Sequence, residues 1–307
     1  GGGDGDGDGD GGSSTTPPLA TTAAAATAPP ATTAAKPNVA TAAATPPAMA
    51  PSSAPSYAPA MREVTVAIEG CLHGEVDVLY DTLMYIEKQR GVRPDFVLCC
   101  GDFQSIRDRD DLKSLAVPEK FKALGAFGDY YTGKKVAPYL TIFVSGNHEA
   151  SNFLSEIFYG GWIAPNMYYL GAAGVVNVCG LRIAGLSGIY KSHDYNLGHF
   201  EQVPYNDKTK RSVYHVRELE AFRLTQLTGS IDIMMSHDWP AGIVHHGDGE
   251  KLFRVKKFLR KEVDTFGSVP GMRLLKLLRP RYYFCSHMHV KWHAVVRHDD
   301  DDGGGSG

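Results

Sequence analysis

The sequence lacks a long apolar run and contains few cysteines. No stretch reaches the roughly 18 consecutive apolar residues that a membrane-spanning helix needs, so no span is expected. The five cysteines are an odd number, which argues against a disulfide framework and favours a reducing compartment. Four of them lie in or beside predicted strands and are expected to be small buried side chains: Cys99, Cys100, Cys179 and Cys285.

The first 60 residues have too few large apolar side chains to form a core. They are a Gly/Asp repeat followed by Ala, Thr and Pro, so 1–60 is predicted to be a disordered low-complexity tail. They lack a continuous apolar segment after a basic start, so no secretory signal is expected, while a transit function stays open. The acidic, Gly-rich residues 299–307 are predicted to be a second disordered tail.

Residues 61–298 have the composition of a globular domain with one sizeable core. The net charge is −3, and the two tails account for seven excess negative charges, which leaves about +4 and a mild preference for anionic partners. The apolar runs VTVAI, DFVLC, LTIFV and IDIMM predict strands, residues 75–90 and 213–228 predict helices, and GMRLLKLLRPRYYFC predicts a helix before a last strand. This alternation favours a layered α/β fold.

Five polar clusters each follow a predicted strand. Their residues should therefore lie on loops just past strand ends, where the active sites of α/β proteins gather. Clusters of His, Asn and Asp in this order are typical of a two-metal phosphoesterase, because two divalent ions can activate water and neutralise the phosphoryl oxygens. The clusters are GCLHG at 70–74, CGDFQ at 100–104, GNHEA at 146–150, MSHDW at 235–239 and CSHMH at 285–289.

Asp102 is the best candidate for the carboxylate that bridges two metal ions, although a single Gly-Asp pair would usually be a turn. Asn147 and His148 are adjacent and point in different directions, which suits one ligand and one catalytic group. We therefore predict that the Asn147 amide oxygen binds metal and that His148 protonates the leaving oxygen. A nearby carboxylate such as Glu149 could keep His148 protonated beside the metals.

The remaining candidate ligands are histidines and one cysteine. His237 follows IDIMMS, and His287 and His289 form an H-x-H pair whose side chains would project to the same side of an extended segment. The first cluster has Cys71 and His73 where most phosphoesterases of this layout have D-x-H. A thiol ligand would favour zinc or iron, whereas a Cys71 that only packs beside His73 would leave a weaker metal pocket.

The order C-x-H, GD, GNHE, SHD and SHMH resembles the calcineurin-like metallophosphoesterase superfamily, and the Cys of the first motif resembles the RNA lariat debranching enzymes within it. The segments EGCLHGE, YGGWIAPNMYYLGAAGVV, GLSGIYKSHDYNLGHFEQVPY and SHDWP are also similar to that family, over nearly all of 61–293. The resemblance implies a four-layer α/β/β/α sandwich that hydrolyses the 2',5'-phosphodiester bond at the branch point of intron lariat RNA. It also implies a nuclear location, and we expect a monomer.

The resemblance further implies two divalent metal ions, which would be Fe²⁺, Zn²⁺ or Mn²⁺, and His148 as general acid. The residues implied for one metal are His73, Asp102 and His289, with Cys71 beside them. The residues implied for the other metal are Asp102, Asn147, His237 and His287.

The segment 191–216 matches the lariat-recognition insertion of that family, although an ordinary solvated loop is the alternative. Its aromatic residues could stack on splayed bases and its basic residues could meet phosphates. The candidates are Tyr195, Phe200, Tyr205, Lys208, Lys210 and Arg211. His193, His199 and His215 stay open as further substrate contacts. The basic stretch 251–261 could extend an RNA track or be a solvated face.

The sequence departs from the family pattern after SHMH, where WHAVV runs into the acidic end. Strands that complete one sheet are therefore expected to be missing, which would leave an open edge. Two alternatives to a debranching enzyme remain at this stage. One is a phosphoesterase acting on a cyclic nucleotide or a phosphoprotein, and the other is a non-catalytic scaffold with the same fold.

Overall fold

The computed structural model describes residues 63–298, so the tails predicted at 1–60 and 299–307 lie outside the described residues. The chain divides into two units, Gly1–Pro59 and Ala60–Gly307, and all described residues belong to the second. Within the described part, no helix is both long enough and apolar enough to cross a membrane.

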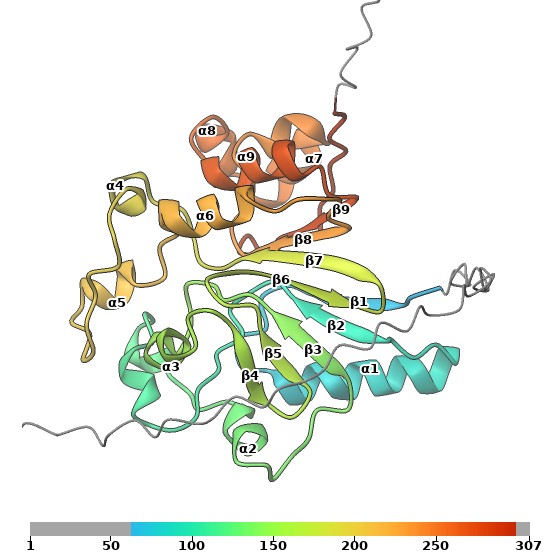
Figure 1. The fold of residues 1–307 in the computed structure, drawn as a ribbon, viewed down its shortest axis with the longest axis vertical. Helices are drawn as coiled ribbons and strands as arrows, with labels where there is room; N and C mark the ends of the chain where they lie inside the picture. Colours follow the sequence, from blue (N-terminus) through green and yellow to red (C-terminus); the bar gives the residue numbers. More distant parts are fainter. Residues whose placement is uncertain (1–62, 299–307) are drawn as a thin grey trace, which may run out of the picture. The chain divides into compact units, whose positions relative to one another are not determined.

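Two sheets form the centre of the second unit (Figure 1). In the first sheet the strands run in the order β1 (Val66–Glu69), β2 (Phe96–Cys99), β3 (Leu140–Phe143), β5 (Met167–Tyr169) and β4 (Gly161–Ala164). Neighbouring strands are parallel except β4, which is antiparallel to β5. In the second sheet the order is β6 (Ala173–Val178), β7 (Leu181–Leu186), β8 (Ile233–Ser236) and β9 (Tyr282–Phe284), with only β6 and β7 antiparallel.

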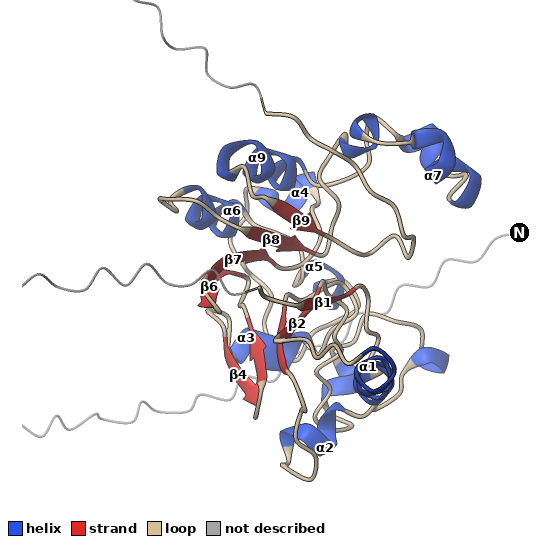
Figure 2. Cartoon of the chain, turned by 90° about the vertical axis from the view of Figure 1, so that its right-hand side faces the viewer, coloured by secondary structure: helices blue, strands red, loops and turns tan. Residues whose placement is uncertain are grey.

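Helices cover the outer face of each sheet (Figures 1 and 2). The helices of the described residues are α1 (Val76–Arg90), α2 (Phe127–Tyr131), α3 (Ser151–Glu156), α4 (Ser192–Tyr195), α5 (Thr209–Ser212), α6 (Glu218–Thr225), α7 (Gly249–Val255), α8 (Leu259–Glu262) and α9 (Val269–Leu278). The first three belong to the half of the fold built on the first sheet, and α6 and α9 pack on the second. The predicted four-layer α/β/β/α architecture is therefore confirmed.

Side chains of the central strands alternate between two buried cores, one on each face of the sheet. In β2, Phe96 and Leu98 face the second sheet and pack with Ile183 and Ile233, while Val97 packs toward the helices on the opposite face. Successive side chains of a strand point to opposite faces, so a strand covered on both sides must be apolar throughout. All four residues of β2 are buried, as the continuous run in the sequence predicts.

Two local predictions need correction. The helix predicted over 213–228 begins only at Glu218, because Arg217 before it is extended and the Val216 amide donates to the Ile189 carbonyl at 2.9 Å. Cys179, predicted to be buried, is exposed at the turn between β6 and β7. It shares that two-residue turn with Gly180, and both have positive φ, which is the geometry that short hairpins favour.

Candidate metal centre

The five polar clusters follow β1, β2, β3, β8 and β9, as predicted, and their side chains meet in one place. Four residues offer ligand atoms that all lie within 4.8 Å of one another: Cys71, His73, Asp102 and His289. The Nε2 atoms of His73 and His289 are 3.1 Å apart, and His73 Nε2 lies 3.8 Å from Asp102 Oδ2. The Cys71 thiol faces the same loops, because its Sγ accepts a hydrogen bond from the His287 amide at 3.1 Å.

A second set of atoms gathers on the other oxygen of Asp102. Asp102 Oδ1 lies 3.4 Å from His237 Nε2, whereas Oδ2 faces His73. The same His237 nitrogen lies 3.1 Å from Asn147 Oδ1 and 3.2 Å from His287 Nδ1. Asp102 therefore stands between the two sets, which is the position that a bridging carboxylate requires.

Hydrogen bonds fix which nitrogen of His237 faces the site. Its Nδ1 lies 3.0 Å from the Cys100 carbonyl and must carry the proton to donate to it, while the Ser286 hydroxyl donates to the same carbonyl at 2.6 Å. The lone pair of Nε2 then points at the oxygens of Asn147 and Asp102. Three electron-rich atoms facing one another repel unless a cation lies among them, so this donor set fits a metal ion.

The protonation states suit metal binding. Burial lowers the pKa of His73 and His237 and brings that of His287 to about 4, so these imidazoles are neutral near neutral pH. Burial raises the pKa of the Asp102 carboxyl, but the attraction of positive charge on the rings of His237 and His148, together with the hydrogen bond from the His148 amide, outweighs it and lowers that pKa. Neutral imidazoles and an ionised carboxylate are the forms that bind divalent ions.

Four of the candidate ligands have left-handed backbone conformations, with φ of 50° at His73, 48° at Asp102, 64° at His287 and 46° at His289. Such values are uncommon for residues other than Gly and cluster at functional sites. The assumption that the H-x-H pair is extended was therefore wrong. The two imidazoles still reach one cluster, but His287 contacts His237 while His289 contacts His73.

Two glycines make room for the ligands. Gly101 has φ of 117°, and a Cβ there would overlap the ring of His237. A Cβ at Gly146 would overlap the Asp102 carboxylate and lie 2.6 Å from its backbone nitrogen. These glycines directly precede Asp102 and Asn147 in the sequence, yet only the structure shows which side chains need the space.

Glu149 has a different role from the one predicted. Its buried carboxylate accepts hydrogen bonds from the amides of Phe103 at 2.7 Å, Gln104 at 2.8 Å and Gly146 at 3.2 Å. It therefore ties the loop of Asp102 to the loop of Asn147, and its hydrogen bonds go to these backbone amides and not to His148. Burial, followed by the Asp102 charge, raises the pKa of Glu149 to about 8.

His148 lies beside the centre without a fixed partner on its ring. Its backbone amide donates to Asp102 Oδ1 at 2.8 Å, and its ring centroid is 5.7 Å from that of His73. Within residues 63–298, its buried Nδ1 atom has no hydrogen-bond partner. The imidazole is thus held close to the ligands, with a polar atom left for a bound group.

The aromatic candidates of the insertion have different surroundings. Phe200 is 53% exposed, and the guanidinium of Arg217 lies over its ring at 5.5 Å. Tyr205 is half-buried, with its hydroxyl 3.0 Å from that of Ser155. Tyr195 packs against the core between the second sheet and the helices α6 and α9. Phe200 is the most accessible of the three for stacking.

Some of the basic and histidine candidates are exposed, and others form ion pairs within the insertion or with α6. Lys208 and Arg211 are exposed, whereas Lys210 pairs with Asp207 at 2.7 Å. The open histidines are mostly engaged. His199 pairs with Glu220 at 2.9 Å and His215 with Asp194 at 2.6 Å, while the exposed His193 lies 3.5 Å from the same Asp194 carboxylate.

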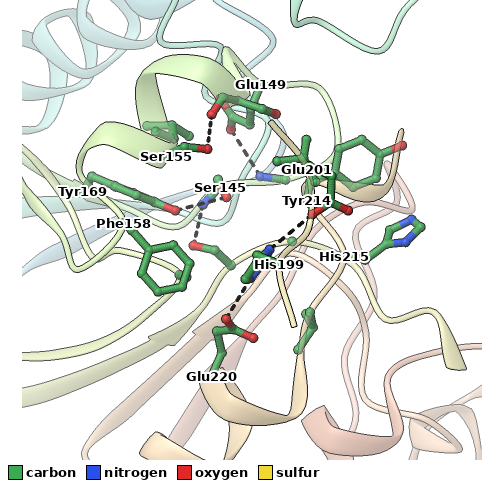
Figure 3. Close-up of a pocket in the computed structure, with 18 of the residues that line it drawn as sticks. Ser145, Glu149, Ser155, Phe158, Tyr169, His199, Glu201, Tyr214, His215 and Glu220 are labelled. Carbon is green, nitrogen blue, oxygen red and sulfur yellow. Dashed lines mark hydrogen bonds and ion pairs between the residues drawn. The ribbon is translucent and has the colours of Figure 1, made fainter. Parts of the chain in front are cut away.

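A cavity of about 510 Å³ separates the insertion from the loop of the metal centre (Figure 3). Ser145, Gly146 and Glu149 line one side, and Tyr214 and His215 line another. Tyr214 was not among the predicted contacts. Ser286, whose hydroxyl lies 2.9 Å from His237 Nδ1, was also missed, because a serine inside a histidine cluster gives no distinct signal.

Comparison with known proteins agrees with this geometry. The family model of calcineurin-like phosphoesterases matches residues 64–291. The chain is 54% identical to a lariat debranching enzyme of Danio rerio over 236 residues, 53% to that of Homo sapiens over 242, and 50% to that of Arabidopsis thaliana over 238. These matches cover 76%, 78% and 77% of this chain but 42%, 44% and 57% of the relatives.

The chain therefore spans about half the length of the curated relatives it matches. The family model nevertheless covers most of the described residues, and it includes every candidate ligand from Cys71 to His289. The strand order, the loops and the convergent ligands agree with that match. This chain belongs to the calcineurin-like phosphoesterase family.

Proposed function

We propose that this chain hydrolyses the 2',5'-phosphodiester bond at the branch point of excised intron lariat RNA. The observation that carries the proposal is the meeting of a thiol, Cys71, with His73, Asp102 and His289 at one point. It is supported by relatives that are named lariat debranching enzymes and are 50–54% identical to this chain. The insertion beside the centre offers exposed aromatic and basic side chains for RNA.

The centre would hold two divalent ions, Fe²⁺, Zn²⁺ or Mn²⁺. Cys71, His73 and His289 would hold one ion, and Asn147, His237 and His287 would hold the other, with Asp102 between them. Bound there, such ions neutralise the phosphoryl oxygens and lower the pKa of bound water. The thiol of Cys71 favours zinc or iron over harder ions.

His148 would give a proton to the leaving oxygen. The hydrogen bond from its backbone amide to Asp102 Oδ1 would hold it beside the reacting phosphate, and its ring has an unpartnered nitrogen within the described residues. The ribose alkoxide that leaves is a strong base, so protonation lowers the barrier to bond cleavage. Phe200, Tyr205 and Tyr195 would contact bases, and Lys208, Lys210 and Arg211 would contact phosphates. A monomer in the nucleus fits this substrate.

The test of the proposal is cleavage of a branched RNA with one 2',5' linkage beside a linear 3',5' control. The protein is reconstituted separately with iron, zinc or manganese. Selective cleavage at the branch is expected. Equal cleavage of both RNAs would overturn the specificity, and no cleavage by a folded, metal-loaded protein would favour the scaffold alternative.

Replacing His148 tests its role. Because general acids contribute about 10²- to 10⁴-fold, His148→Ala is expected to lower kcat by that factor. Its metal content, measured by elemental analysis, should match the wild type. A variant that also loses its metal would show that His148 holds the centre together and would contradict the assignment as an acid.

A further inference from the structure

A basic surface covers α7 and α8, outside the centre and outside the insertion. Six cations and no acidic residue occur between positions 251 and 261. Five of the six are exposed, and Lys256 is half-buried. We call the set the α7–α8 surface, and its residues are Lys251, Arg254, Lys256, Lys257, Arg260 and Lys261.

Most of this charge is not neutralised locally. Arg260 pairs with Glu250 at 2.6 Å, and the other five cations form no ion pair with any residue in 63–298. These cations lie on two short helices and in the turn between them, where like charges repel one another, and the helices themselves contribute only Glu250 and Glu262 of the opposite sign. Since a solvated face usually mixes both signs, the arrangement favours a polyanionic partner.

Exposed apolar side chains among these cations indicate which kind of polyanion the surface would bind. Phe258 is 49% exposed and Val255 is 63% exposed. Proteins that bind single-stranded nucleic acid combine a positive track for phosphates with exposed aromatic rings for bases. An acidic peptide offers the charge but not the flat rings that Phe258 would stack on, so single-stranded RNA fits better.

The α7–α8 surface is fixed to the loops of the metal centre. The indole of Trp239, two residues after His237, donates to the Ser286 carbonyl at 2.6 Å. The indole of Trp292, three residues after His289, donates to the carbonyl of Asp248 before α7 at 2.9 Å, and the two indoles stack at 5.3 Å. Figure 2 shows α7 standing clear of the second sheet, so its outer side is accessible.

We propose that the α7–α8 surface binds a single-stranded arm of the branched RNA through its phosphates, with Phe258 stacking on a base. The identity of this RNA rests on the function proposed above. The surface would add affinity for long substrates without touching the scissile bond. It is therefore expected to act on KM and not on kcat.

The experiment compares two variants with the same change in charge. Lys257→Glu with Lys261→Glu alters the surface, and Lys88→Glu with Arg90→Glu alters exposed positions on α1, across the fold (Figure 1). Each is assayed on a branched RNA without arms and on one with a long single-stranded arm. Circular dichroism establishes that both variants fold.

The surface variant should raise KM for the armed RNA about tenfold at low salt and leave the armless RNA unchanged. Losing two phosphate contacts on a single strand should also reduce the slope of log affinity against log salt by about 1.4. The α1 variant should change neither quantity. Equal effects of the two variants, or equal effects on the two RNAs, would overturn the proposal.

Binding of labelled oligouridylate, measured by fluorescence anisotropy, tests the RNA-binding surface independently of the proposed catalytic function. If the wild type cleaves neither RNA, the proposed function fails, yet weaker oligouridylate binding by the surface variant alone would still support an RNA-binding surface. Unchanged binding would refute it. Displacement by polyglutamate as effective as displacement by RNA would show a general polyanion site and would also refute it.

Discussion

Asp102 shows how much of the centre depends on single residues. It is 1% exposed, its two oxygens face different sets of ligands, and the backbone of His148 donates to one of them. Nothing larger than hydrogen fits at Gly146 beside this carboxylate. The Asp102 carboxylate therefore occupies a space that is available only because residue 146 has no side chain.

Gly146→Ala is expected to displace the Asp102 carboxylate and reduce bound metal at least tenfold, because the new Cβ must occupy its place. Elemental analysis of the purified variant measures this loss. Gly161→Ala is the matched control, since a Cβ there meets no atom within 4 Å. Normal metal content in Gly146→Ala would show that Asp102 is not a ligand.

Among the elements, the insertion is held by a buried polar network. Arg217 and Glu201 form an ion pair at 2.6 Å with both side chains 1% exposed. Arg217 also donates to the Asp194 carbonyl at 3.0 Å. Removing one partner of a buried pair leaves an uncompensated charge, which costs more than the pair contributes. The pair therefore fastens the segment before α5 to the start of α6.

Glu201→Gln is expected to lower the free energy of unfolding by about 3 kcal/mol, because it removes the nearer counter-ion of the buried Arg217 and leaves only Asp194 Oδ2, at 3.5 Å. Hydrogen exchange should increase first in the insertion around Glu201. Denaturant unfolding gives the global value. The control is Asp110→Asn, which breaks an exposed ion pair with Lys113 and should not change stability measurably. Equal effects of the two substitutions would contradict this account.

For the whole molecule, the buried imidazoles link stability to pH. The pKa of His287 falls from 6.5 to about 4 on folding because the ring is buried. Between these values the unfolded chain binds a proton that the folded chain does not, so this residue lowers stability as pH falls from 6.5 to 4. Other buried groups titrate too, so the contribution must be measured as a difference.

The metal-free protein and metal-free His287→Gln are compared by denaturant unfolding from pH 7 to pH 4. The wild type should lose up to about 1.4 kcal/mol per pH unit more than the variant as pH falls. Above pH 7 the difference between them should be constant. A difference that does not depend on pH would show that His287 keeps its ordinary pKa in the fold.

Local sequence was sufficient for β1, β2, β3, β8 and β9 and for the types of side chain at the candidate centre. Continuous apolar runs such as that of β2 mark strands buried on both faces, and polar clusters after such runs mark the loops at their ends. It was less informative for β4, β5 and β6, which no periodic pattern marked. Their segment is short, rich in Gly and interrupted by Pro165.

The relations between distant segments came from the packing of the two sheets. Which oxygen of Asp102 faces His237, why Gly146 must lack a side chain, and why Glu149 binds backbone amides instead of His148 all depend on atoms brought together from different loops. Periodicity reports only which face of its own element a residue occupies. The sequence alone thus determines which chemical groups are present, whereas their distances and partners are determined only when the two sheets pack together.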